Sequence, residues 1–140
     1  MPVRDLIGDS VVVLGTSKVS INSATTTAFD FGTPNDIDLT AESGYLPGMR
    51  ILVVFDASTA GTTDTVSFSV QDAPDSSGSI GSVATAVTDG TLTGGTGDQY
   101  AITGVRLQPD RPWLRCNVTS DGANDTFVAQ CHVLGIPAKL

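Results

Sequence analysis

The stretch "QDAPDSSGSIG", residues 71–81, contains residue types that could bind a divalent cation. Asp72 and Asp75 stand on either side of a proline and are followed by serine and glycine. Calcium takes six to eight oxygen ligands, several of them usually carboxylates. The same acidic and amide residues recur in other loops, at Asp36, Asp38, Asp121, Asn124 and Asp125. None of these loops has the regular D-x-D-x-D-G spacing, and Asp and Asn also stabilise turns through nearby backbone amides. We therefore expect turn structure, with no bound metal or cofactor.

A thiol paired with an imidazole is the second chemistry that the residue types allow. The chain has one histidine, His132, and two cysteines, Cys116 and Cys131. His132 follows Cys131 directly in a strand-like segment, so their side chains point to opposite faces of a sheet and cannot pair. We therefore expect a half-exposed sheet histidine and a protein that is not an enzyme. Both cysteines alternate with apolar residues, which predicts buried free thiols, with a cross-strand disulfide as the alternative.

The segment "LQPDRPWLRC", residues 107–116, contains the single tryptophan. Two prolines bracket Asp110 and Arg111 and bring Trp113 to the start of a strand. Trp113 has the opposite parity from Cys116, which would place it outside the main core. An exposed tryptophan beside Arg111 would be a good interface anchor. The alternative is a tryptophan that closes one end of a sandwich.

The net charge of the chain argues against some classes of binding partner. The 140 residues suffice for one domain, and 15 acidic against 7 basic residues give a net charge of -8. Nucleic acids and anionic membranes attract basic surfaces, so neither is an expected partner. The N-terminal apolar run is short and interrupted by Asp and Gly, unlike a secretory signal. We therefore expect the chain to be made and folded in a cytoplasm.

The elements that must position these residues are short strands. "TVSFSVQ" alternates with period two, and "RILVVFDAS", residues 50–58, is a continuous apolar run that predicts a strand covered on both faces. "RPWLRCNVTS" and "DTFVAQCHVLG" are expected to form a hairpin across "SDGAND". Glycine and proline turns separate the strands, and no segment sustains a helical period. This pattern predicts an all-β, antiparallel β-sandwich or jelly-roll domain over residues 11–140, preceded by a short N-terminal arm, residues 1–10.

Two of these segments resemble a known family. "QDAPDSSGS", which follows a strand, and "RPWLRCNV", which begins a later one, are similar to segments of the capsid cement, or decoration, proteins of tailed bacteriophages. The similarity extends to "RDLI" in the N-terminal arm. The resemblance implies a virion protein on the capsid exterior that binds the major capsid protein. It also implies a homodimer or homotrimer at capsid symmetry axes, which would bridge neighbouring capsid subunits and has no catalytic residues.

The expected contact residues lie in two places, the arm and the tryptophan segment: Arg4, Asp5, Leu6, Ile7, Arg111 and Trp113. In the arm, Leu6 and Ile7 would supply apolar contact on binding. The alternative function is a carbohydrate-binding or adhesin-type β-sandwich module, in which Tyr45, Tyr100 and Trp113 would converge on a sugar. Aromatic residues are only 6% of the chain, which counts against that alternative.

Overall fold

The structure is a computed structural model that describes residues 11–32, 36–39, 50–59, 63–89, 92 and 94–136. The predicted arm, residues 1–10, lies outside them. Within the described residues there is no helix, and thus none that could cross a membrane. The described strands are β1 (Val12–Ile21), β2 (Thr26–Ala28), β3 (Ile37–Asp38), β4 (Arg50–Thr59), β5 (Val66–Ala73), β6 (Ala84–Thr85), β7 (Val87–Thr88), β8 (Gln99–Arg106), β9 (Trp113–Ser120) and β10 (Phe127–Ile136).

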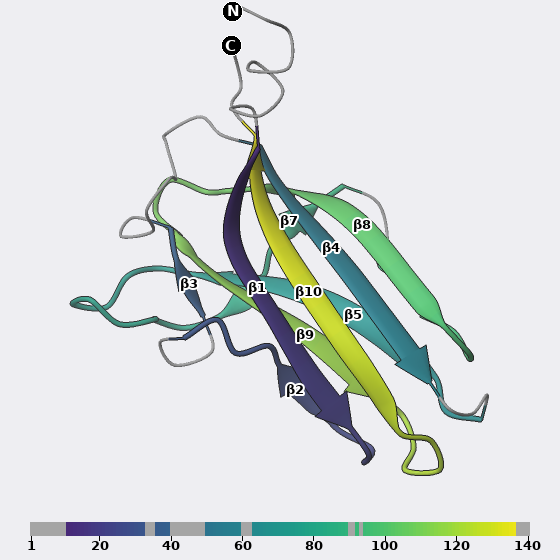
Figure 1. The fold of residues 1–140 in the computed structure, drawn as a ribbon. Coiled ribbons are helices and arrows are strands. Elements are labelled where there is room, and N and C mark those ends of the chain that lie inside the picture. Colours follow the sequence, from purple (N-terminus) through teal and green to yellow (C-terminus); the bar gives the residue numbers. More distant parts are fainter. Residues whose placement is uncertain are drawn as a thin grey trace, which may run out of the picture.

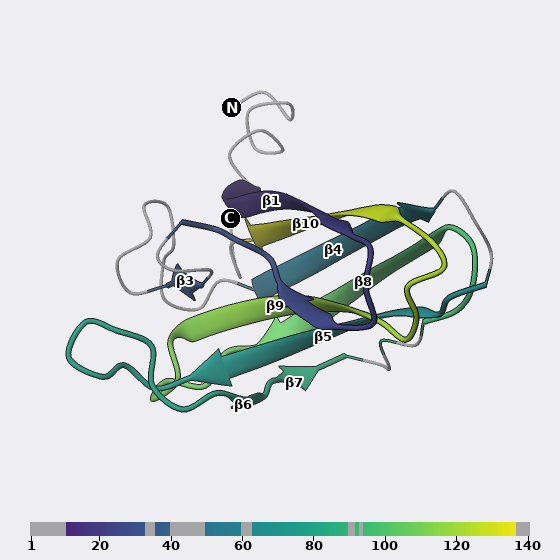
Figure 2. The ribbon, with the colours of Figure 1, turned by 90° about the horizontal axis from the view of Figure 1, so that it is seen from below.

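These strands form two antiparallel sheets that pack face to face. Sheet A has the order β1-β10-β4-β8-β7, and sheet B has the order β2-β9-β5-β6, with β3 also paired to β9. Figure 1 shows the strands of sheet A in front of those of sheet B, and Figure 2 shows the two layers from below. From β4 onward the long strands alternate between the sheets, as in a jelly roll. The predicted all-β antiparallel sandwich is confirmed.

The core lies between the sheets and follows from period-two alternation. Every second residue of β10, from Phe127 to Gly135, is buried, and the residues between them are half-buried. Phe55 of sheet A stacks on Phe68 of sheet B with ring centroids 4.7 Å apart, and Phe29 lies 6.0 Å from Phe55. Each aromatic side chain removes a large apolar area from water, so this cluster holds the two sheets together.

The predicted hairpin between β9 and β10 is wrong. β9 belongs to sheet B, where it pairs with β5, and β10 belongs to sheet A, where it pairs with β1 and β4. The "SDGAND" loop therefore crosses from one sheet to the other. The predicted alternation is nevertheless correct, because Cys116 and Cys131 are both fully buried, free thiols. They face the same interior from opposite sheets.

The prediction that residues 51–55 are covered on both faces is also wrong. Ile51, Val53 and Phe55 are buried against sheet B, with exposed fractions of 1% or less. Leu52 and Val54 point the other way and are only half-buried on the outer face of sheet A. No other layer of the described chain covers that face (Figure 1).

The interior position of the thiols gives a test of this topology. Burial raises the pKa of the Cys131 thiol, and a hydrogen bond with Cys116 raises it further. Since the thiolate is the reactive form, we expect both cysteines of the native protein to react with Ellman's reagent roughly a hundredfold or more slowly than in the guanidinium-unfolded chain. Rapid reaction of both thiols without unfolding would contradict this arrangement of β9 and β10.

Candidate functional site

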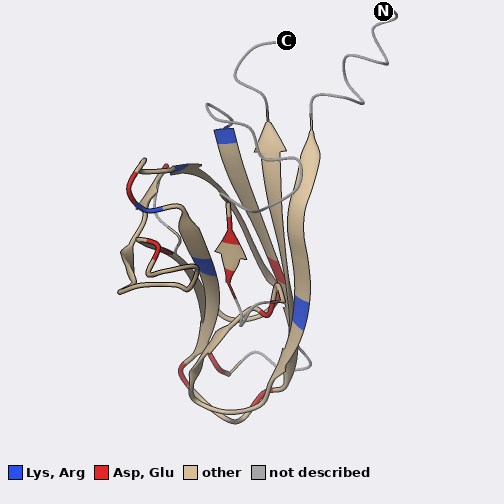
Figure 3. Ribbon diagram, turned by 90° about the vertical axis from the view of Figure 1, so that its left-hand side faces the viewer, with Lys and Arg blue, Asp and Glu red and all other residues tan. Residues whose placement is uncertain are grey.

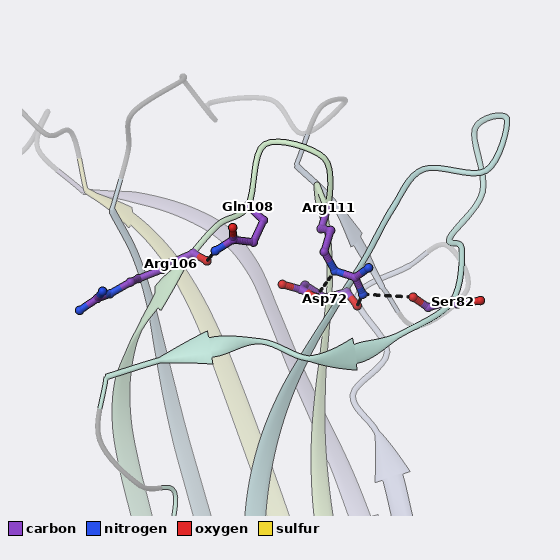
Figure 4. Close-up of polar contacts among 5 residues, drawn as sticks. All are labelled: Asp72, Ser82, Arg106, Gln108 and Arg111. Atoms are coloured by element: carbon purple, nitrogen blue, oxygen red, sulfur yellow. Dashed lines mark hydrogen bonds and ion pairs between the residues drawn. The ribbon is translucent and has the colours of Figure 1, made fainter.

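Arg111 of the tryptophan segment binds the acidic segment at the end of β5. Asp72 is 3% exposed, and the Arg111 Nε donates to its Oδ1 at 2.5 Å. The Nη2 of Arg111 also donates to the backbone oxygens of Asp72, at 2.7 Å, and Ser82, at 3.2 Å. Figure 4 shows Arg111 reaching from the loop before β9 to both. The ion pair therefore joins three segments at one end of the sandwich, which is a structural role.

Trp113 lies at the same end and is buried. It is 3% exposed, and its Nε1–H donates to the Oδ1 of Asp75 at 3.0 Å. The backbone N–H of Gly78 donates to the other carboxylate oxygen at 3.1 Å. The Trp113 hydrogen bond, followed by that of Gly78, lowers the pKa of Asp75. Trp113 is buried outside the core cluster between the sheets, as its parity predicted, and it does not present its ring to solvent as an interface anchor would.

Arg115 holds a second buried carboxylate on the outer side of sheet B. Its Nε donates to Oδ1 of Asp36 at 2.7 Å and its Nη2 donates to Oδ2 at 3.0 Å. The Asp36 side chain is fully buried, and its hydrogen bond raises the pKa of Arg115. A planar guanidinium that meets both carboxylate oxygens is a strong and geometrically specific pair.

The loops before β5 and after β9 share a reciprocal carboxylate network. Asp64 accepts hydrogen bonds from the backbone and side-chain nitrogens of Asn124 and from the backbone N–H of Asp125. Asp125 in return accepts from the backbone N–H groups of Thr63 and Asp64, both at 2.8 Å. A Cβ on Gly122 would lie 2.1 Å from Asp64 Oδ1, so this close approach requires glycine. These hydrogen bonds lower the pKa of Asp64, the Asn124 side chain contributing most.

The acidic residues that suggested a cation site thus have protein partners. Among the residues that the structure describes, no group of three or more His, Cys, Asp or Glu side chains is placed to hold a metal ion. Asp121 also accepts a hydrogen bond, from the backbone N–H of Thr65 at 2.6 Å. The loops therefore act as turn and cross-loop connections.

The outer face of sheet A has no other layer of the described residues packed on it. Val13 and Ile102 are 60% and 59% exposed, and Tyr100 is 80% exposed. Cross-strand pairing places them beside half-buried apolar residues, since Val13 lies opposite Leu134 and Ile102 lies opposite Val54. We define the apolar face by six residues: Val13, Leu52, Val54, Tyr100, Ile102 and Leu134.

His132 lies within this face, between Thr16 of β1 and Val54 of β4. Its Nδ1 and the Oγ1 of Thr16 are 2.9 Å apart and share a hydrogen bond. It is half-buried and on the opposite side of β10 from Cys131, as the alternation predicted.

The described cations divide into two groups. Arg111 and Arg115 are bound to buried carboxylates, as above. The others, Lys18, Arg50 and Arg106, are exposed and lie on the outer face of sheet A, Arg106 beside Asp89 at 3.7 Å. Figure 3 shows basic positions on β1 and at the start of β4 in a chain whose other charges are largely acidic. This face therefore carries three exposed cations, together with the exposed Asp56 of β4.

This face was not predicted as a functional surface, although the sequence of β4 contains a signal for it. The continuous apolar run of β4 indicated a partner on each side, and the fold supplies only one. The predicted contact residues do not converge on it. Arg111 and Trp113 are held in the interior contacts described above, and the arm residues lie outside the described residues: Arg4, Asp5, Leu6 and Ile7.

Comparisons with known proteins show a shared fold. No family model matches the sequence, and no curated protein matches it. The CBM22-1 xylan-binding domain of Paenibacillus barcinonensis Xyn10C superposes with a TM-score of 0.50 at 9% identity, over 92% of this chain and 97% of that domain.

Two further solved structures are more distant. The CBM22-1–GH10 modules of Clostridium thermocellum xylanase 10B match with a TM-score of 0.45 at 13% identity, over 94% of this chain and 28% of that one. A chain of the cyanophage Pam1 capsid asymmetric unit matches with a TM-score of 0.37 at 16% identity, over 91% and 85%. At these identities the chain shares a β-sandwich fold with the xylan-binding domain, and no function follows from the likeness.

The depressed pKa of Asp64 predicts a loss of stability in acid. Because its folded pKa lies below the ordinary value of 3.8, its stabilising contribution is present above that value and disappears as the pH falls through the folded pKa. We expect the melting temperature of the parent protein to drop more steeply than that of Asp64→Asn between about pH 5 and pH 3. Asp110→Asn, in an exposed loop, is the matched control. Equal slopes for the parent and Asp64→Asn would refute the role of this network.

The hydrogen-bonded state of Asp72 and Asp75 predicts indifference to calcium. Both carboxylates are occupied by Arg111, Trp113 and Gly78, so millimolar calcium or EDTA should leave the melting temperature unchanged. Asp72→Asn should lower the free energy of unfolding by about 1–3 kcal/mol in either condition, since the buried Arg111 contact weakens. A calcium-dependent rise of several degrees in the parent protein, absent from Asp72→Asn and Asp75→Asn, would establish a cation site instead.

Proposed function

We propose that this protein is a virion structural protein, a capsid decoration protein that binds the outside of a tailed-phage head. One observation carries the proposal. The acidic and polar loop residues are used in internal contacts, whereas the outer face of sheet A presents apolar side chains with no partner in the described chain. An exposed, contiguous set of apolar side chains marks a protein–protein contact surface, which the homo-oligomer of a decoration protein requires. The sequence resemblance to cement proteins supplies the class of partner, the major capsid protein.

The mechanism is bridging by a homo-oligomer. An oligomer that touches several capsid subunits gains from effective concentration, so each contact can be weak. In the arm, Leu6 and Ile7 supply apolar contact, and Arg4 and Asp5 supply charged contact. The protein would be synthesised in the host cytoplasm and would act without catalytic residue, cofactor, nucleic acid or membrane.

The alternative of carbohydrate binding has one feature in its favour, the fold shared with a xylan-binding domain. Sugar sites usually stack aromatic rings on the sugar, and Trp113 is buried. Tyr45 lies outside the described residues, and among the described Trp and Tyr residues only Tyr100 is exposed, which leaves one described ring for stacking. Capsid contact is therefore the better-supported function.

Co-sedimentation with mature tailed-phage heads that lack their decoration protein tests the proposal. We expect binding that saturates at a fixed number of copies per major capsid subunit, with heads that then survive heating better. A Leu6→Ser, Ile7→Ser variant should bind roughly tenfold or more weakly, because each buried aliphatic side chain contributes at least 1.5 kcal/mol or so. The control is a variant with Ala84→Ser in β6.

Affinity electrophoresis in xylan and in mixed β-glucan runs in parallel with the head-binding experiment. Retardation by a polysaccharide, together with no binding to heads by a folded protein, would replace the capsid proposal with the carbohydrate one.

A further inference from the structure

We propose that the outer face of sheet A is a self-association surface, on which a second copy of this chain docks face to face. The two-fold axis would lie in the plane of the interface, perpendicular to the strands, and would pass over Val53. The two copies would then meet with their β4 strands antiparallel and within about 30° of each other, as in packed sheets generally.

The sequence of β4 is the first argument for a covering layer. Ile51 to Phe55 are all apolar, a pattern typical of strands that are buried on both faces. Sheet B covers Ile51, Val53 and Phe55, and Leu52 and Val54 face the uncovered side together with Ile102. A second copy would bury that side and give β4 the environment that its composition indicates.

The charges on β4 are the second argument, because they are symmetric about Val53. Arg50 and Asp56 are both exposed on the outer face and stand six residues apart, so about 20 Å separates them within one chain. They cannot pair with each other there. The proposed two-fold axis brings Arg50 of one copy opposite Asp56 of the other, twice in each dimer. Packed sheets lie about 10 Å apart, a gap that an arginine and an aspartate side chain can span.

The two-fold axis also relates the positions on either side of Val53 in β4, and these are complementary. Leu52 of one copy meets Val54 of the other, so the apolar centre packs on itself. On β8, Gly104 meets Ile102, and the Asp89 carboxylate occupies the space that a side chain on the glycine would fill. Arg106 meets Tyr100, an arrangement that allows a cation–π contact.

Net charge favours this face over any other for self-association. Two chains of net charge -8 repel each other, and the repulsion is smallest when the least acidic surfaces meet. Exposed cations outnumber carboxylates on this face, where Asp56 and the Asp89 beside Arg106 stand against three cations: Lys18, Arg50 and Arg106. β1, β10, β4 and β8 have 8 to 10 residues each and together cover roughly 600 Å² in the plane of the sheet, which is the low end of specific interfaces at about 600 Å² per partner. The area fits a dimer of moderate affinity.

This inference does not depend on the proposed function, because the experiment uses the pure protein alone. Sedimentation equilibrium should show a dimer when the concentration is raised to roughly 100 μM, because an interface of moderate affinity is occupied at that concentration. Arg50→Asp and Asp56→Arg should each be monomeric at the same concentration, because each places like charges opposite one another twice. Circular dichroism and melting temperature check that both variants fold, as expected for exposed positions.

An equimolar mixture of the two variants is the decisive measurement. The aspartate introduced at position 50 of the first variant would then meet the arginine introduced at position 56 of the second. The native Asp56 of the first would meet the native Arg50 of the second, so a heterodimer should form from two monomers. Lys18→Asp reverses a charge on the same face outside these pairs and should stay dimeric. A monomeric or trimeric parent protein, single variants that remain dimeric, or a mixture that stays monomeric would each overturn the proposal, whatever the head-binding experiment shows.

Discussion

The structure depends on the burial of the two inner sheet faces against each other. Neither sheet can remove its inner apolar face from water alone, since β4 and β10 direct their buried aromatic, aliphatic and thiol side chains toward the other sheet. The stack of Phe55 on Phe68 is the closest aromatic contact across this interface. Because the side-chain period of a strand is two, a shift of one residue in any central strand would turn its whole apolar set toward solvent. The contact between sheets therefore sets the register of both.

Once the sheets are fixed in this way, the backbone N–H groups of the loops at both ends of the sandwich still need hydrogen-bond partners. Backbone–backbone hydrogen bonds satisfy many of these groups, and acidic side chains accept from others. Asp64 and Asp125 accept backbone N–H groups from each other's loops, and Asp75 accepts both the Trp113 indole and a backbone N–H. A charged acceptor makes a stronger hydrogen bond than a neutral one, which suits loops that have little apolar surface to bury. Much of the acidity of the chain is in this sense architectural.

Period-two alternation allowed the inner faces of β5, β9 and β10 to be predicted, because one face of each is covered by the opposite sheet. It could not assign strands to sheets: "SDGAND" is as short as a hairpin loop, yet it crosses the sandwich. The partners of the buried carboxylates were equally hidden. Arg111 and Asp72 are 39 residues apart in the chain, and Arg115 and Asp36 are 79 apart, with no local pattern to link them. The exposed face of β4 was misjudged since a single chain's sequence does not say whether a covering layer belongs to the same molecule.

The place of β10 in sheet A has a consequence for biosynthesis. This strand, the last that the structure describes, lies between β1 and β4, and β9 lies likewise at the centre of sheet B. Neither sheet can close until β9 and β10 have left the ribosome. Until then, no strand pairs with the edges of β1 and β4 that β10 will occupy. These unpaired edges are open to other nascent chains. Both sheets therefore depend on pairing between distant parts of the chain, which makes folding slow.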